Sequence, residues 1–217
     1  MNLSKKYMPY ILWAIALALF IAMPSLVSDS RLKILGKCLS LGIVALGIDL
    51  SWGFTGLLSL GQGIFFSLGG YAIAMFLQLN SLKEGIPEFF GLYGVRELPF
   101  FWEPFKSPLF TLIAIWLIPG LIAGLIGYLV FRNRIKGVYF SILTQAALLV
   151  FFNFFNGQQK LINGTNGLPT PNTILFGTMV GDPLMQKYFY YLSGILVIVF
   201  YLISKWLVSK RFGSILI

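Results

Sequence analysis

Residues 50–82 read LSWGFTGLLSLGQGIFFSLGGYAIAMFLQLNSL, a run of 33 residues without a single charge. One straight helix of that length would measure roughly 50 Å, whereas the hydrocarbon core of a bilayer is about 30 Å thick. Glycines recur along the run, and glycine weakens a regular helix. The stretch therefore predicts a turn near residues 51–55, followed by one membrane-spanning helix over about residues 56–79.

The rest of the chain has the same apolar character. Hydrophobic residues make up 58% of the 217 residues and charged residues only 11%, whereas an average soluble domain is about 25% charged. Further apolar runs predict spans over about residues 9–27, 34–51, 108–131, 137–156 and 188–208. We therefore expect an all-α fold, a polytopic transmembrane bundle of about six spans in one domain over residues 1–217, with outer loops over 80–107 and 157–187.

Basic residues beside the spans predict the orientation, because cytoplasmic loops carry an excess of Lys and Arg. The cluster Arg132-Asn133-Arg134-Ile135-Lys136 lies in a short loop without an acid, which favours the cytoplasmic side for this loop and for both termini. The first span is expected to remain as an anchor rather than be cleaved as a signal peptide, since its apolar run exceeds the usual length of about 7–15 residues.

The composition also excludes several kinds of chemistry. The chain has no histidine and a single cysteine, Cys38, which argues against histidine-based catalysis, an intrachain disulfide framework and a cysteine metal site. The sequence has no P-loop, so we expect no cofactor in this chain and ATP use only by a partner. The net charge of +9 would suit nucleic acid, but the long uncharged runs fit a membrane far better, and no nucleic-acid partner is expected.

Polar groups within the apolar runs are the candidates for a substrate path, because such groups face protein or a water-filled cavity rather than lipid. Asp49 lies near one end of its span, and an interfacial role and a gating role both remain open. Ser141 and Gln145 are four residues apart, on one predicted helix face. The candidates are Asp49, Ser59, Gln62, Tyr139, Ser141 and Gln145, and the glycines expected to permit close backbone approach are Gly53, Gly56, Gly61, Gly63, Gly69 and Gly70. A packed interior is the alternative to a path.

Two features distinguish the outer loops. Asn-Gly pairs favour turns with positive φ, so the run Asn163-Gly164-Thr165-Asn166-Gly167 predicts a tight outer turn. The other loop is rich in aromatic residues, which predicts a belt at the membrane interface or, second, a surface for a partner. These aromatic residues are Phe89, Phe90, Tyr93, Phe100, Phe101, Trp102 and Phe105.

The order of glycines, aromatics and polar residues in 50–72, LSWGFTGLLSLGQGIFFSLGGYA, resembles the signature of the LivM-type permeases of ABC importers. That family serves branched-chain amino acids and urea. Residues 97–105 (ELPFFWEPF), 136–146 (KGVYFSILTQA) and 163–168 (NGTNGL) are similar to its urea branch, UrtC. Members usually carry His where this chain has Gln62, so a titrating role does not carry over to that position.

The resemblance implies a permease subunit in a bacterial inner membrane, with the lipid bilayer as its surroundings. It also implies a second homologous permease subunit, cytoplasmic ATPase subunits that hold ATP, and a periplasmic substrate-binding protein. Members continue past a stretch like Arg211-Phe212-Gly213 into a coupling loop and further helices, so the resemblance is to the N-terminal part of a permease.

Urea is the substrate that this reading favours, because a neutral molecule rich in donors and acceptors suits a path of uncharged polar groups. A zwitterionic amino acid calls for helix termini or charges. Branched-chain amino acid transport, a secondary transporter or channel, and an inactive remnant or scaffold remain as alternatives.

Overall fold

The computed structural model describes the backbone of residues 3–82 and 85–209. Glu84 and the stretch Arg211-Phe212-Gly213 lie outside these residues, as do the side chains of residues 3–7, 9 and 10. The long helices of the described chain are α1 (Leu3–Leu26), α2 (Asp29–Thr55), α3 (Gln62–Asn80), α5 (Pro108–Arg132), α6 (Val138–Gly157) and α8 (Pro183–Ser209). The expected all-α bundle is confirmed.

Five of these helices, α2, α3, α5, α6 and α8, are long and apolar enough to cross a membrane. In α1 the described apolar part, Ile11–Leu26, is shorter, so a crossing by the first predicted span stays a prediction. The exposed side chains of the five helices are largely apolar: Leu112, Trp116 and Leu121 on α5, for example, are each more than half exposed. Such a surface is stable only against lipid or other protein.

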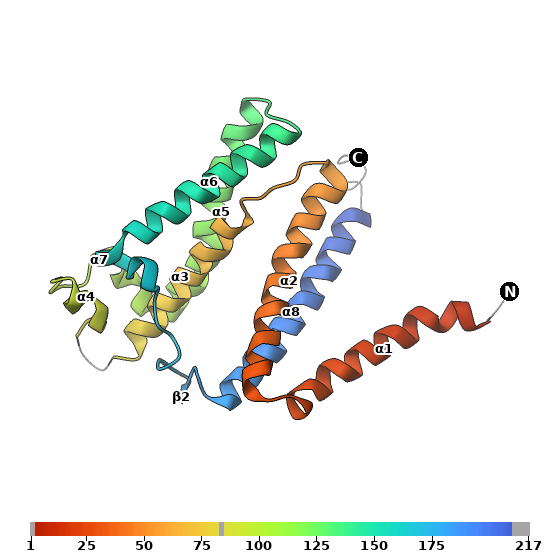
Figure 1. Cartoon of the computed structure of the whole chain (residues 1–217), viewed down its shortest axis with the longest axis horizontal. Helices are drawn as coiled ribbons and strands as arrows, with labels where there is room; N and C mark the ends of the chain where they lie inside the picture. The colour runs from red at the N-terminus through yellow and green to blue at the C-terminus, as the bar shows by residue number, and fades with distance from the viewer. Residues whose placement is uncertain (1–2, 83–84, 210–217) are drawn as a thin grey trace.

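The helices form two groups (Figure 1). Helix α2 lies beside α8, and α3 packs with α5 and α6. Helix α1 diverges from both groups towards its N-terminus and meets α8 near its other end. There the ring of Phe20 stacks on Tyr190 with centroids 4.9 Å apart, over Gly194, where a Cβ atom would collide with that ring.

The break between α2 and α3 lies later than predicted. The expected turn at 51–55 is helical, and α2 ends only where Gly56 adopts φ +68 and its N–H donates to the Trp52 carbonyl. Residues 56–61, here called the linker, are not helical, and α3 begins at Gln62 rather than near 56. Gly56 ends the helix because glycine adopts the left-handed backbone conformation with little strain, unlike residues that carry a Cβ atom. Helix α8, in turn, begins at Pro183, ahead of the predicted 188.

The two loops predicted to be outer fold into a cap at the end of the bundle where α3 and α6 finish (Figure 1). The cap comprises α4 (Glu88–Leu92), a 3₁₀ turn η1 (Glu103–Lys106), α7 (Gln159–Ile162), η2 (Gly164–Asn166) and an antiparallel hairpin of β1 (Ile174–Leu175) and β2 (Thr178–Met179). In the hairpin Ile174 pairs with Met179 and Leu175 with Thr178.

The aromatic residues of the cap are not an interfacial belt, and that prediction is wrong for most of them. Phe89, Phe90, Trp102 and Phe105 are buried in one cluster with Met75 of α3 and residues of α5 and α7. Only Phe100, at 84% exposed, and to a lesser degree Phe101 face outward. The rings therefore form a core that covers the ends of α3 and α5.

Candidate functional site

The linker is held against the first two turns of α6 by side-chain hydroxyl groups. The N–H of Leu60 donates to Thr144 Oγ1 at 3.1 Å, and Ser141 Oγ donates to the carbonyl of Leu58 at 2.8 Å. Backbone that leaves the helical geometry needs other polar partners when water is scarce. The sequence of α6 supplies them by placing two hydroxyls three residues apart, on one helix face.

Glycine allows this close contact at two positions. A Cβ atom on Gly61 would lie 3.0 Å from the Thr144 carbonyl oxygen, and one on Gly63 would lie 3.1 Å from Leu148 Cδ1. Gly69 faces Ile115 of α5 at an ordinary 3.8 Å. The predicted close approach is therefore present at these glycines. It is absent at Gly53, Gly56 and Gly70, around which no other described element comes within 4 Å of a built Cβ.

A cavity of about 200 Å³ lies between the linker, the end of α2, and helices α3, α5 and α6. We call it the linker cavity. Its lining is apolar except for a few uncharged polar residues, and none of the lining residues carries a charge. The polar lining residues are Ser51, Ser59, Gln62 and Thr144.

Two of these polar side chains are available to a bound molecule. Ser59 is buried, at 7% exposed, and neither its hydroxyl nor the amide of Gln62 is bonded to another described residue. The Thr144 hydroxyl, by contrast, is already used by the linker and by the Ser141 carbonyl. A hydroxyl and an amide without internal partners can donate and accept hydrogen bonds with a small polar molecule.

The structure separates the six predicted path residues into two sets. Ser59, Gln62 and Ser141 come together at the linker. Asp49 is exposed on the last turns of α2, Tyr139 is 77% exposed at the start of α6, and Gln145 is exposed further along it. None of these last three residues lines the linker cavity or bonds to the linker.

Sequence reasoning grouped Ser141 with Gln145, whereas the structure places the hydroxyl of Thr144 with that of Ser141 at the linker. Helical neighbours lie at both three and four residues, so Thr144 was as good a candidate for the same face as Gln145. Ser51 was placed in a turn rather than at the cavity, because the helix end was expected too early. A search for hydroxyls at both spacings along α6 would have paired Thr144 with Ser141.

The structure forms a turn at 163–167, where the Asn-Gly pairs predict one, and its position on the outer side stays a prediction. Asn163 has φ +59 and Gly164 has φ +39, and Asn163 Nδ2 donates to the Gly167 carbonyl at 2.7 Å. The hydroxyl of Tyr93 reaches both Asn163 Oδ1 at 3.2 Å and Gln159 Oε1 at 3.1 Å. The turn therefore joins the two outer loops, and the structure gives it a structural role.

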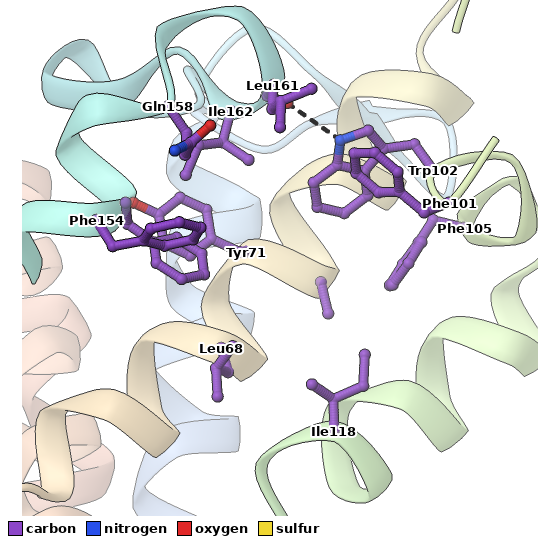
Figure 2. Close-up of a pocket in the computed structure, with 12 residues that line it drawn as sticks. Leu68, Tyr71, Phe101, Trp102, Phe105, Ile118, Phe154, Gln158, Leu161 and Ile162 are labelled. Carbon is purple, nitrogen blue, oxygen red and sulfur yellow. Dashed lines mark hydrogen bonds between the residues drawn. The ribbon is translucent and has the colours of Figure 1, made fainter. Parts of the chain in front are cut away.

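A second cavity of about 340 Å³ lies beneath the cap (Figure 2). Trp102 covers it from the cap, and its indole N–H donates to the Leu161 carbonyl at 3.1 Å. Tyr71 of α3 and Phe154 of α6 face it from the bundle. Its lining is aromatic and aliphatic apart from Gln158 and the hydroxyl of Tyr71, so it offers a neutral polar molecule fewer partners than the linker cavity does.

No cluster of three or more His, Cys, Asp or Glu that could hold a metal occurs among the residues that the structure describes. Neither cavity contains a charged lining residue. The chemistry open to both is therefore the binding of an uncharged or locally neutral group through hydrogen bonds and apolar contact.

A family model described as branched-chain amino acid transport system / permease component matches residues 30–217. The comparisons with curated proteins and with solved structures find no match. The family model covers most of the chain, including the linker, the cap and all five helices long enough to cross a membrane. Permeases of this family are membrane components that act with an ATPase and a substrate-binding protein, and are not themselves enzymes. The chain therefore belongs to the family of branched-chain amino acid transport system permeases, and is a multi-pass inner-membrane component of an ATP-binding cassette transporter.

Proposed function

We propose that this permease serves an importer of urea and that the linker cavity forms part of the substrate path. The observation that carries the proposal is the lining of that cavity, which combines the free polar groups of Ser59 and Gln62 with no charged side chain. Urea is neutral, small and rich in donors and acceptors, so such a lining can replace its hydration.

In this proposal the linker is the element that adapts to the substrate. Its backbone is held by the hydroxyls of Ser141 and Thr144 rather than by helical bonds, so a shift of α6 against α3 would change the cavity without unwinding a helix. ATP is bound and hydrolysed by separate partner subunits, a second homologous permease subunit completes the path, and a periplasmic protein delivers the substrate. The N-terminus and the α5–α6 loop face the cytoplasm.

The test is uptake of radiolabelled urea and leucine by the importer assembled with its partners in proteoliposomes. We expect ATP-dependent uptake of urea, and a reduction of about tenfold or more in Ser59→Ala and Gln62→Leu, since each change removes a partner of the substrate. Gln145→Leu is the matched control, because Gln145 is exposed and bonds to no described residue near the cavity. Unchanged urea uptake in both cavity variants would contradict the proposed path.

Branched-chain amino acids are the second candidate. The description of the family model favours them, and so does the apolar part of the cavity lining, which includes Ile64, Phe65 and Val130. An aliphatic side chain would gain from contact with those residues. Uptake of leucine without uptake of urea in the same assay would show that leucine, not urea, is the substrate. Leucine uptake by the Ser59→Ala and Gln62→Leu variants would then test whether the path runs through the linker cavity.

A further inference from the structure

The loop between α5 and α6, residues 133–137, has a fixed conformation and is here called the basic loop. The N–H of Arg134 donates to the Phe131 carbonyl at 3.1 Å, and the N–H of Ile135 donates to the Val130 carbonyl at 3.2 Å. Arg134 adopts φ +54, and Ile135 is half-buried between two exposed cations, Arg134 and Lys136. The loop therefore presents both cations from a backbone that is already ordered.

The two cations line a cavity of about 690 Å³ at this end of the bundle. Thr55 and Leu57 border it from the end of α2 and the linker, and Phe131 and Ile135 border it from α5 and the basic loop. No acidic residue lines it. Helix α6 begins at the same place without a side-chain cap on its first N–H groups, because its N-cap residue is a glycine. The helix terminus thus adds to the positive potential of the cavity.

Within the part of the chain that the structure describes, no ion pair balances the positive charge of this cavity. Arg132, the third cation of the cluster, is engaged on its own helix: its Nη1 donates to the Tyr128 hydroxyl at 2.7 Å, and its guanidinium lies 5.5 Å from the centre of that ring. Arg134 and Lys136 have no hydrogen-bonding side-chain partner and no ion pair among residues 3–82 and 85–209. Two cations that share a cavity without a counter-charge attract an anion.

The lining also indicates which kind of anion fits. Beside the two cations it contains the apolar side chains of Leu57, Phe131 and Ile135. Tyr128 and Phe131, on the last turns of α5, are 58% and 60% exposed, which places an apolar helix face next to the cavity. A free phosphate would use only the cations, whereas a phospholipid also offers a glycerol backbone and acyl chains to the apolar part.

We propose that this cavity binds the headgroup of an anionic phospholipid, with the phosphate on Arg134 and Lys136 and the glycerol region against Leu57, Phe131 and Ile135. The proposal goes beyond the transport function and does not depend on which substrate is carried. The bound lipid contacts the linker and the basic loop at once, so it bridges the linker to the start of α6.

The experiment measures lipid retention by the whole chain. The protein is placed in phosphatidylcholine nanodiscs with a rising fraction of phosphatidylglycerol, and native mass spectrometry counts the anionic lipids that stay bound. We expect Arg134→Gln/Lys136→Gln to weaken phosphatidylglycerol binding about tenfold or more, since each basic group near the surface contributes to lipid attraction. The charge-preserving pair Arg134→Lys/Lys136→Arg should retain most of the binding.

The matched control is Lys33→Gln/Lys37→Gln. These two exposed lysines lie one helical turn apart near the start of α2, border a smaller cavity, and sit at the opposite end of the bundle from the basic loop (Figure 1). The control removes the same net charge, so it should leave phosphatidylglycerol binding near that of the unaltered chain. An equal loss in both pairs would show general electrostatic attraction and overturn the site.

Other outcomes overturn the choice of ligand. Displacement of phosphatidylglycerol by millimolar inorganic phosphate would assign the cavity to a free anion. Unchanged lipid binding in Arg134→Gln/Lys136→Gln, together with weaker association of the ATPase subunits, would assign it to a protein partner. If the double variant fails to fold by circular dichroism, Lys136→Gln alone carries the test, because Lys136 is exposed and outside both helices.

Discussion

The two ends of α6 are held in place by different kinds of contact. Its first turns hold the linker with the hydroxyls of Ser141 and Thr144 around a cavity that contains free polar groups. Its last turns meet the cap, where Phe155 packs against the buried cluster that contains Trp102 and Phe105. The first end is held by a few directional bonds and the second by buried rings. We therefore expect changes at the cap to alter stability most, and changes at the linker to alter transport most.

The largest effect is expected in the cap. Phe90 is fully buried, and Phe90→Ala should lower the free energy of unfolding by about 3–5 kcal/mol, because it removes a large apolar contact and leaves a cavity. Thermal unfolding of the purified protein in detergent measures this change. Phe100→Ala is the control, because Phe100 is 84% exposed. Equal losses of unfolding free energy in the two variants would show that the buried rings of the cap do not stabilise the protein more than exposed ones.

A smaller effect, with opposite signs in the variant and its control, is expected for two glycines. Gly61→Ala should cost about 1–3 kcal/mol, since its Cβ would press on the Thr144 carbonyl at 3.0 Å. Gly70→Ala, in the interior of α3 with open space around it, should stabilise the helix by about 0.5–1 kcal/mol. The same unfolding assay compares the two. A stabilised Gly61→Ala variant would mean that the linker does not lie against α6.

Thr144→Val tests whether the linker end matters for transport more than for stability. The change leaves the Leu60 N–H without its acceptor at nearly constant volume, which should cost about 1–2 kcal/mol. Urea uptake by the assembled importer should fall further than the loss of folded protein explains, with Gln145→Leu as the neighbouring control. If uptake falls only as much as the amount of folded protein, the hydrogen bonds of the linker contribute to stability and not to transport.

The smallest effect is expected within the cap, at the contact between Tyr93 and the turn at 163–167. Tyr93→Phe removes the hydroxyl that reaches Gln159 and Asn163 and should cost about 0.5–1.5 kcal/mol, the usual net worth of a hydrogen bond. Uptake per folded molecule should not change. A clear drop in uptake without a drop in unfolding temperature would show that the cap also contributes to the path, against the contrast drawn between the two ends of α6.

Much of the fold could be read from residue order, because apolar runs are local. The runs at 108–131 and 137–156 predict helices within about a residue of α5 and α6. The cap could not be read in this way. A cluster of rings has the same composition whether it faces headgroups or packs on Met75 and Ile162, and those partners come from distant parts of the chain. The aromatic residues were therefore placed in the wrong environment.

The candidate site was predicted in part for a similar reason. Glycine and polar residues in one apolar stretch indicated an irregular backbone, and Ser59 and Gln62 do line a cavity there. The partner across that cavity depended on the rotation of α6, which no local pattern specifies. That rotation turns Thr144 towards the linker and leaves Gln145 and Tyr139 exposed.

The sequence by itself determined that the chain is a bundle of apolar helices with a break in the uncharged run 50–82, because the hydrophobicity and backbone freedom of each residue act where that residue stands. Only the tertiary structure decided which hydroxyl accepts the hydrogen bond from the linker, which rings are buried and which cations share a cavity. Those outcomes depend on pairs of residues that are far apart in the chain, and their register is set by the packing of whole helices.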